Sequence, residues 1–167
     1  MRYAITATAA LASFAGAAYA EDAATPAIQA IVPEGMEAIV EQYTYSPAVR
    51  AGDFVFLAGV VASLPTDEDG EIATATPENL TAAYERAFAT IETVLNEAGA
   101  GWTDVVEMTT YHKDELHKQI DAFIPVKNKY QAEPYPAWTA IDIDRLYPDG
   151  GVTEIRVIAY APLEHTE

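Results

Sequence analysis

Apolar residues recur at helical spacing in one long segment of the chain. Between Leu80 and Ala98 they occupy the i, i+3, i+4 and i+7 positions of a single helix face. Thr76 suits the N-cap, Pro77 suits the first helical position, and Gly99 follows the last apolar position. The pattern therefore predicts a long amphipathic helix whose apolar face needs a sheet to pack against.

Other segments are rich in β-branched and aromatic residues and predict strands. They cover residues 38–49, 54–61, 102–111, 135–143 and 152–160. A second helix is predicted between the third and fourth of them, with Asp121 as its cap, Pro125 in its first turn, and Phe123, Val126 and Tyr130 on one face.

This order of elements predicts an α+β fold, in which a mixed sheet is covered on one face by two helices. The uncovered face still carries Phe, Tyr, Val and Ile side chains. Because a sheet with two apolar faces usually closes against another subunit, we expect an oligomer.

The N-terminus has the pattern of an export signal. Arg2 supplies a positive charge, residues 4–18 are small and apolar, and Ala18-Tyr19-Ala20 has the form of a cleavage site. We expect residues 1–20 to be a signal peptide, 21–37 an irregular arm, 38–162 the folded domain and 163–167 a tail. The mature protein would be periplasmic or secreted, with no membrane attachment after cleavage. The alternative is an N-terminal helix that is kept in the mature protein.

Composition excludes several classes of function. The chain has 167 residues, no cysteine and a formal net charge of −17, so disulfide frameworks, thiol nucleophiles and cysteine-ligated zinc are ruled out. The acidic balance opposes binding of a nucleic-acid phosphate backbone. His112 and His117 are five residues apart, whereas two ligands on one helix face need a spacing of four, so we expect no metal site.

A series of short motifs resembles the Rid family (YjgF type) over residues 38–161. The motifs are Tyr45-Ser46-Pro47-Ala48-Val49, Gly52-Asp53, Ala58-Gly59, Asn79-Leu80, Ala98-Gly99, Asp104-Val105-Val106, Pro134-Tyr135-Pro136-Ala137 and Glu154-Ile155. The resemblance implies a chorismate-mutase-like α+β fold, a homotrimer, and ligand clefts between neighbouring subunits. It also implies hydrolysis of enamines and imines, such as 2-aminoacrylate and 2-iminopropanoate, to 2-keto acids and ammonia without a cofactor. Some family members carry a ribonuclease label, which the acidic charge of this chain argues against.

The sequence departs from the family pattern at one informative position. In active members an arginine follows the Pro-Ala that corresponds to Pro136-Ala137, and it binds the substrate carboxylate; here the residue is Trp138. An indole offers one N–H donor and no charge, so it cannot replace a bidentate guanidinium. Stacking on Trp138 would instead favour a flat or uncharged ligand.

Two further positions match cleft residues of the family. Tyr45 corresponds to a tyrosine that lines the cleft, although it is equally interpretable as an ordinary strand aromatic. Glu154 corresponds to the glutamate that positions or activates the hydrolytic water. Its alternative role is a carboxylate paired with Arg156, Arg145 or a neighbouring subunit.

Thr139 stands where the family has a serine or threonine, so it retains a hydroxyl, whereas Ala58 lacks the serine of many members. Lys127 falls near the family's cleft asparagine, and a lysine there would supply a positive charge if it reached across the interface; otherwise it is a solvated surface residue.

We therefore expect a small-molecule ligand in an intersubunit cleft, bound by Tyr45, Trp138, Thr139 and Lys127, with Glu154 as the catalytic residue for hydrolysis of an enamine or imine. The alternatives are a non-catalytic binding or chaperone-like trimer, and a standard deaminase in which Lys127 replaces the arginine.

Overall fold

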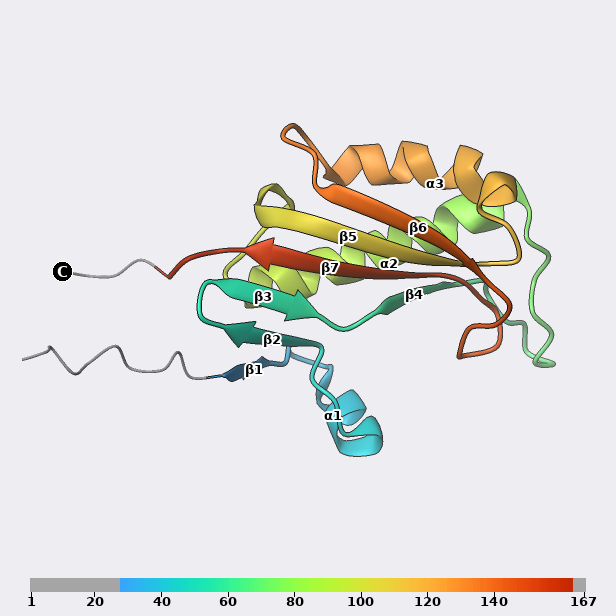
Figure 1. Cartoon of the computed structure of the whole chain (residues 1–167). Coiled ribbons are helices and arrows are strands. Elements are labelled where there is room, and N and C mark those ends of the chain that lie inside the picture. Colours follow the sequence, from blue (N-terminus) through green and yellow to red (C-terminus); the bar gives the residue numbers. More distant parts are fainter. Residues whose placement is uncertain (1–27, 164–167) are drawn as a thin grey trace, which may run out of the picture.

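The computed structural model describes residues 28–163, which form one mixed sheet with helices packed against it (Figure 1). The strands are β1 (Gln29–Ile31), β2 (Ala48–Ala51), β3 (Phe54–Leu57), β4 (Val60–Ser63), β5 (Val105–Lys113), β6 (Ala137–Ile143) and β7 (Gly151–Tyr160). The helices are α1 (Glu37–Tyr43), α2 (Pro77–Glu97) and α3 (Leu116–Tyr130). The predicted signal peptide lies outside the described residues.

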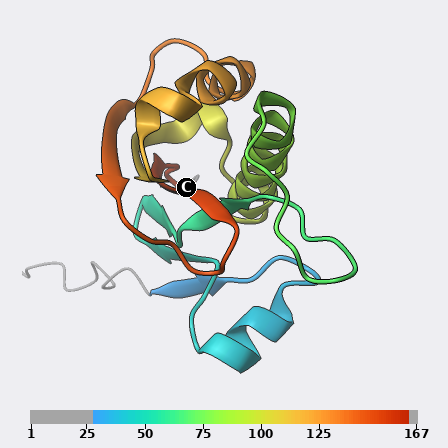
Figure 2. The ribbon, with the colours of Figure 1, turned by 90° about the vertical axis from the view of Figure 1, so that its right-hand side faces the viewer.

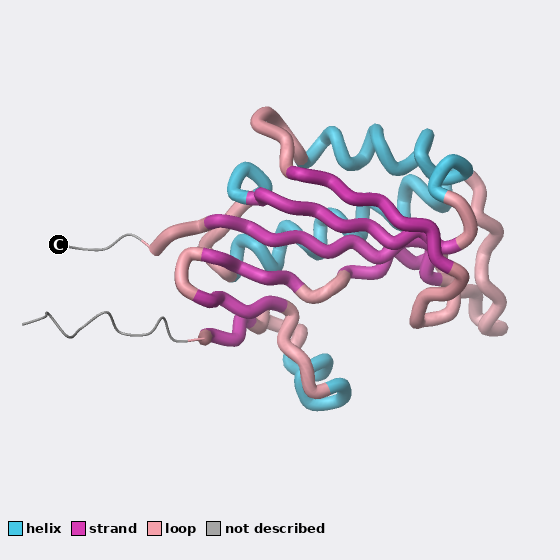
Figure 3. The backbone as a smooth tube through the Cα atoms, viewed as in Figure 1, coloured by secondary structure: helices cyan, strands magenta, loops and turns pink. Residues whose placement is uncertain are grey.

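The sheet has the strand order β1-β2-β3-β7-β5-β6, and β4 also pairs with β7 (Figure 3). The β5–β6 pair is parallel and the other pairs are antiparallel. The parallel pair follows from α3, which connects the end of β5 to the start of β6 across the sheet. The predicted mixed sheet is thus confirmed.

Helices α2 and α3 cover one face of the sheet, as predicted (Figure 2). Thr76 caps α2 by accepting a hydrogen bond from the Asn79 N–H at 3.2 Å, and Pro77 begins the helix. The apolar stripe of α2 is buried against the sheet. Tyr84, Phe88, Ile91 and Leu95 are the largest fully buried side chains that it contributes.

Residues 37–43 form a helix, so the predicted extended segment from residue 38 is wrong at its start. Ile39, Val40 and Tyr43 favour a strand by residue type, yet their spacing also places them on one face of a helical turn. The helix ends at Thr44, which adopts a left-handed conformation with φ 56°, and the Thr44 N–H bonds to Val40 O at 3.0 Å. The arm predicted to be irregular likewise contains β1, which pairs with β2.

The predicted strand 54–61 is broken into β3 and β4 at Ala58-Gly59. Both parts pair with β7, β3 near its end and β4 near its start. A buried apolar run predicts burial but not a break, which is why the sequence pattern did not reveal it.

Helix α3 begins at Leu116, five residues before the predicted cap Asp121, and Pro125 therefore lies in its interior. The Asp142 carboxylate on β6 accepts a hydrogen bond from the Leu116 N–H at 2.8 Å. A side chain from a distant strand thus takes the role that the sequence assigned to a local residue. The predicted strand at 102–111 is also shortened, because Trp102–Asp104 is a 3-10 turn.

The second face of the sheet is not covered by a helix of residues 28–163 and carries apolar side chains, as the sequence predicted. Phe54, Phe56, Ile141 and Tyr160 are between 36% and 44% exposed there. Phe54 and Tyr160 contact edge to face at a centroid distance of 5.3 Å. This exposed aromatic surface is typical of an interface between subunits.

Candidate functional site

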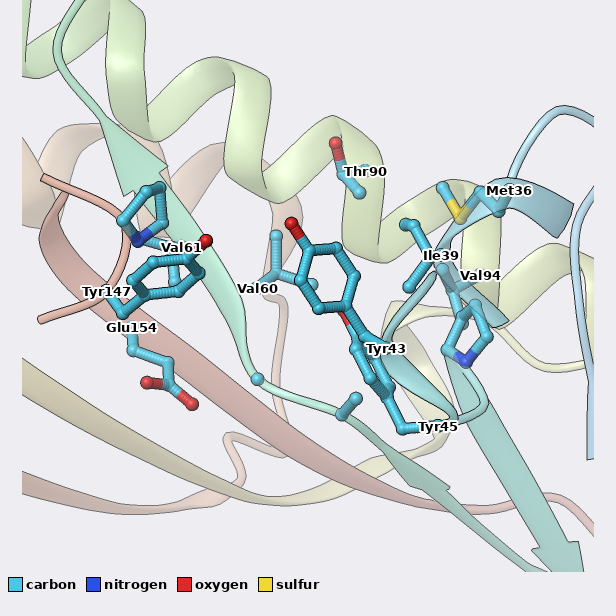
Figure 4. Close-up of a pocket in the computed structure, with 14 residues that line it drawn as sticks. Met36, Ile39, Tyr43, Tyr45, Val60, Val61, Thr90, Val94, Tyr147 and Glu154 are labelled. Carbon is cyan, nitrogen blue, oxygen red and sulfur yellow. The ribbon is translucent and has the colours of Figure 1, made fainter. Parts of the chain in front are cut away.

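A pocket of about 630 Å³ lies between α1, the break that separates β3 from β4, and α2 (Figure 4). Most of its lining is apolar. The polar side chains in it are Tyr43, Tyr45, Thr90, Tyr147 and Glu154. The pocket thus brings together two of the residues that the sequence singled out, Tyr45 and Glu154.

The Glu154 side chain lies against Gly59. Strand β7 pairs Glu154 with Val61 of β4, and the strand break leaves Gly59 beside the carboxylate. A Cβ at Gly59 would overlap the Glu154 carboxyl group. No described residue forms an ion pair with Glu154, so the structure gives no support to pairing with Arg145 or Arg156 within the chain.

Gly59→Ala is expected to displace the Glu154 carboxylate from the pocket while leaving the fold intact, because the backbone at Gly59 does not adopt positive φ. We expect ligand binding or turnover at this pocket to fall at least about tenfold, with a melting temperature within a few degrees of the wild type. Gly101→Ala is the matched control, since the nearest atoms to its Cβ lie at 3.8 and 3.9 Å. Equal activity in both variants would contradict the placement of Glu154.

Tyrosine side chains surround the mouth of the pocket. Helix α1 presents Tyr43, the turn after Thr44 presents Tyr45, and the loop before β7 presents Tyr147 (Figure 4). Hydrogen bonding to Tyr147 is the main cause that raises the pKa of Tyr43, so the Tyr43 phenol is neutral near pH 7. Tyr43, Tyr147 and Gly59 were not predicted as site residues, although Gly59 belongs to the Ala58-Gly59 motif. For Tyr43, its helical spacing from Ile39 was a usable signal.

Trp138 and Lys127 lie together on another part of the chain. The Trp138 ring stacks on Phe123 at a centroid distance of 5.6 Å. The Lys127 ammonium lies 5.5 Å from the Trp138 ring and 5.9 Å from the Tyr135 ring, and burial lowers the pKa of Lys127. Within one chain neither residue lines the pocket of Tyr45 and Glu154.

Thr139 is exposed on β6 next to Trp138. Its backbone pairs with Thr109 of β5. Alternation along β6 places Thr139 on the uncovered sheet face, opposite to the Trp138 side chain that packs on α3. The predicted roles of Trp138, Thr139 and Lys127 in ligand binding therefore depend on a second copy of the chain and stay predictions.

A buried hydrogen-bond network connects Trp138 to the covered face of the sheet. The Trp138 indole N–H donates to Thr110 Oγ1 at 3.0 Å, and Thr110 Oγ1 lies 2.8 Å from His112 Nε2. The Gln119 amide N–H donates to Lys113 O at 2.6 Å, so Gln119 Oε1 is an acceptor. His112 Nδ1 lies 3.1 Å from that oxygen and 3.1 Å from Thr153 Oγ1. Burial lowers the pKa of His112 and so favours the neutral imidazole.

The same network continues through Tyr84 and Thr153. The Tyr84 hydroxyl lies 2.8 Å from Gln119 Oε1 and 3.0 Å from Thr153 Oγ1, and Thr153 donates to Gln119 Oε1 at 2.8 Å. Burial raises the pKa of Tyr84 to about 12. Thr153 is the neighbour of Glu154 on β7, so the network fixes the strand that carries the pocket's carboxylate.

The stability of the fold is expected to fall in mild acid because of His112. Burial lowers the pKa of His112 below 6.5, against the opposing effects of the Gln119 hydrogen bond and the Asp142 charge. The unfolded chain takes up a proton before the folded one, so the stabilisation is complete above pH 6.5 and is lost as the pH falls through the folded pKa. Urea unfolding of His112→Asn between pH 7 and pH 5 is expected to give a shallower pH slope than the wild type. His117→Asn is the control, because His117 is exposed; an unchanged slope in His112→Asn would contradict the argument.

Among residues 28–163, no group of three or more His, Cys, Asp or Glu side chains is arranged to hold a metal ion. No helix in this part of the chain is long and apolar enough to cross a membrane.

Comparison with known proteins confirms the resemblance. The family described as Endoribonuclease L-PSP matches residues 36–161. The chain is similar to the RutC family protein YjgH of Escherichia coli, with 35% identity over 135 residues, which cover 80% of this chain and 95% of that protein. The solved structure of protein YJGH aligns with a TM-score of 0.64 and 31% identity over 81% of this chain and 98% of that one. RidA of the Antarctic bacterium Psychrobacter aligns with a TM-score of 0.57 and 29% identity, over 80% and 97% of the two chains.

Proposed function

Because the chain belongs to the Endoribonuclease L-PSP family and is similar to a RutC family protein and to a RidA, we propose that it binds a small enamine- or imine-like metabolite and hydrolyses it. The observation that carries the proposal is Glu154, a half-buried carboxylate that lines a preformed pocket and has no ion-pair partner among the described residues. Such a group is free to accept a proton from water.

The proposed chemistry needs one carboxylate and no cofactor. Glu154 accepts a proton from a water molecule as the water oxygen attacks the carbon of the protonated imine, which forms a neutral carbinolamine. The Glu154 carboxyl group then gives this proton to the nitrogen. As the C–N bond breaks, the carbinolamine hydroxyl passes its proton to the departing ammonia, and the products are a carbonyl compound and an ammonium ion. An enamine enters the same path after protonation at its carbon.

We also propose that the working form is an exported homotrimer. The uncovered sheet face carrying Phe54, Phe56 and Tyr160 supports self-association, and the family resemblance supports three copies. A neighbouring copy would then bring Trp138, Thr139 and Lys127 towards the pocket of Tyr45 and Glu154. The A-x-A pattern at residues 18–20 supports export.

The test is an imine hydrolysis assay on residues 21–167. Amino-acid oxidase generates 2-iminopropanoate in solution, and semicarbazone formation reports the imine that remains. We expect the wild type to lower the semicarbazone signal only weakly and Trp138→Arg to lower it strongly, because the arginine would restore a carboxylate partner. Light scattering on the same samples is expected to give the mass of three copies. If neither the wild type nor Trp138→Arg lowers the semicarbazone signal, hydrolysis of 2-imino acids is excluded.

One observation favours the alternative, a trimer that binds a ligand without turning it over. The Trp138 indole N–H already donates a hydrogen bond to Thr110, and its ring stacks on Phe123. The side chain is therefore held in place and offers a ligand a ring surface but no free hydrogen-bond donor. Ligand binding to wild type, with no turnover of any imine tested, would support this alternative.

A ribonuclease function is not proposed, although the family description contains the word. A phosphate backbone requires cationic partners, and the pocket offers a carboxylate within a chain of net charge −17.

A further inference from the structure

The charge of the pocket indicates what kind of ligand it accepts. Its lining contains three tyrosines and one carboxylate, and no Lys, Arg or His of the described chain takes part in it. Tyr43 and Tyr45 remain 48% and 46% exposed and Tyr147 75% exposed, so their ring surfaces are open to a ligand. The face of an aromatic ring attracts cations, and a carboxylate does so more strongly.

The same features oppose a ligand that carries a carboxylate. Glu154 would repel it, and the lining gives it no positive partner. Lys127, the cation that a neighbouring copy would bring, already lies over the Trp138 and Tyr135 rings of its own chain. The net charge of −17 further raises the local concentration of cations over that of anions.

The apolar residues that line the rest of the pocket favour a ligand whose uncharged part is apolar. Met36, Ile39, Val60 and Val94 form an apolar surface beside the tyrosines. On one chain the pocket has a volume of about 630 Å³, which lies in the range of small-molecule sites, and its apolar walls suit a ligand with an apolar body.

We propose that this pocket takes an organic cation without a carboxylate, an ammonium or iminium ion with an apolar or aromatic body, whose charge lies between Glu154 and the tyrosine rings. The inference rests on the proposed function for the imine chemistry, and names its substrate class: imines derived from amines rather than from amino acids. Hydrolysis of such an iminium ion by one water molecule yields a carbonyl compound and an ammonium ion, so charge and atoms balance.

The test compares three probes of similar size by calorimetry: benzyltrimethylammonium, benzyl alcohol and phenylacetate. We expect the cation to bind wild type about tenfold more tightly than either other probe. Glu154→Gln and Tyr45→Leu are each expected to weaken the cation several-fold, whereas Tyr135→Leu, an exposed tyrosine outside the pocket, leaves it unchanged.

Tighter binding of phenylacetate than of the cation, lost in Lys127→Met, would overturn the inference and support a lysine clamp. Equal binding of all three probes would overturn it as well, and this comparison needs only the wild type. The outcome is separable from the proposed function. If the protein hydrolyses 2-iminopropanoate and benzyltrimethylammonium does not inhibit it, the proposed function stands and the inference of a cation site is wrong. If the protein binds the cation but hydrolyses no imine, the cation site stands and the proposed function is wrong.

Discussion

Glu154→Gln is expected to abolish most of the proposed imine hydrolysis while leaving the protein folded. The amide has nearly the size of the carboxylate, so it fits beside Gly59, but it cannot accept a proton from water. General-base catalysis contributes about 10²- to 10⁴-fold, and kcat is expected to fall by that factor. The measurement is initial-rate kinetics with the best imine substrate found for the wild type.

Glu92→Gln is the matched control, because Glu92 is exposed on α2 and does not line the pocket. Its kcat is expected to equal that of the wild type. A Glu154→Gln protein with full kcat would show that another group activates the water, and the pocket would then lose its assigned role.

The architecture was predictable where local and long-range preferences agree. Helix α2 has a cap, a proline at its first position and an unbroken apolar stripe, and all of these signals favour one structure. The prediction failed where a distant partner decides. Asp142 caps α3 from another strand, and β7 pairs with both β3 and β4 across their break. Neither contact can be predicted from the spacing of apolar and polar residues within one segment.

The candidate site was predictable in part for the same reason. Tyr45 and Glu154 were identified by family resemblance, and the fold places them in one pocket. Tyr147 belongs to an irregular loop, where no periodicity marks a functional residue, and Gly59 matters only because Glu154 lies beside it. Trp138 was expected to stack on a ligand, and its hydrogen bond to Thr110 shows a second role within the chain that the sequence did not indicate.

Removing the Arg50 guanidinium is expected to cause the largest loss of stability. Arg50 is 4% exposed on β2. Its Nη1 donates to Ala161 O at 2.6 Å and its Nη2 to Ala98 O at 2.6 Å, so one side chain ties β2 to the end of α2 and to the segment after β7. The charge is compensated by these carbonyls and by the C-terminal end of α2.

Arg50→Met keeps much of the apolar stem and leaves two buried carbonyls without a donor. We expect the free energy of unfolding to fall by about 3 kcal/mol, which corresponds to a melting temperature lower by about 10 °C. Arg86→Met is the control, since Arg86 bonds Ser63 O at 2.9 Å in an exposed position, and its loss is expected to stay within about 0.5 kcal/mol. Because the partners of Arg50 are carbonyls, its contribution should not vary with pH between about 5 and 9, in contrast to that of His112. Equal losses in the two arginine variants would contradict a central role for Arg50 in joining the sheet to α2.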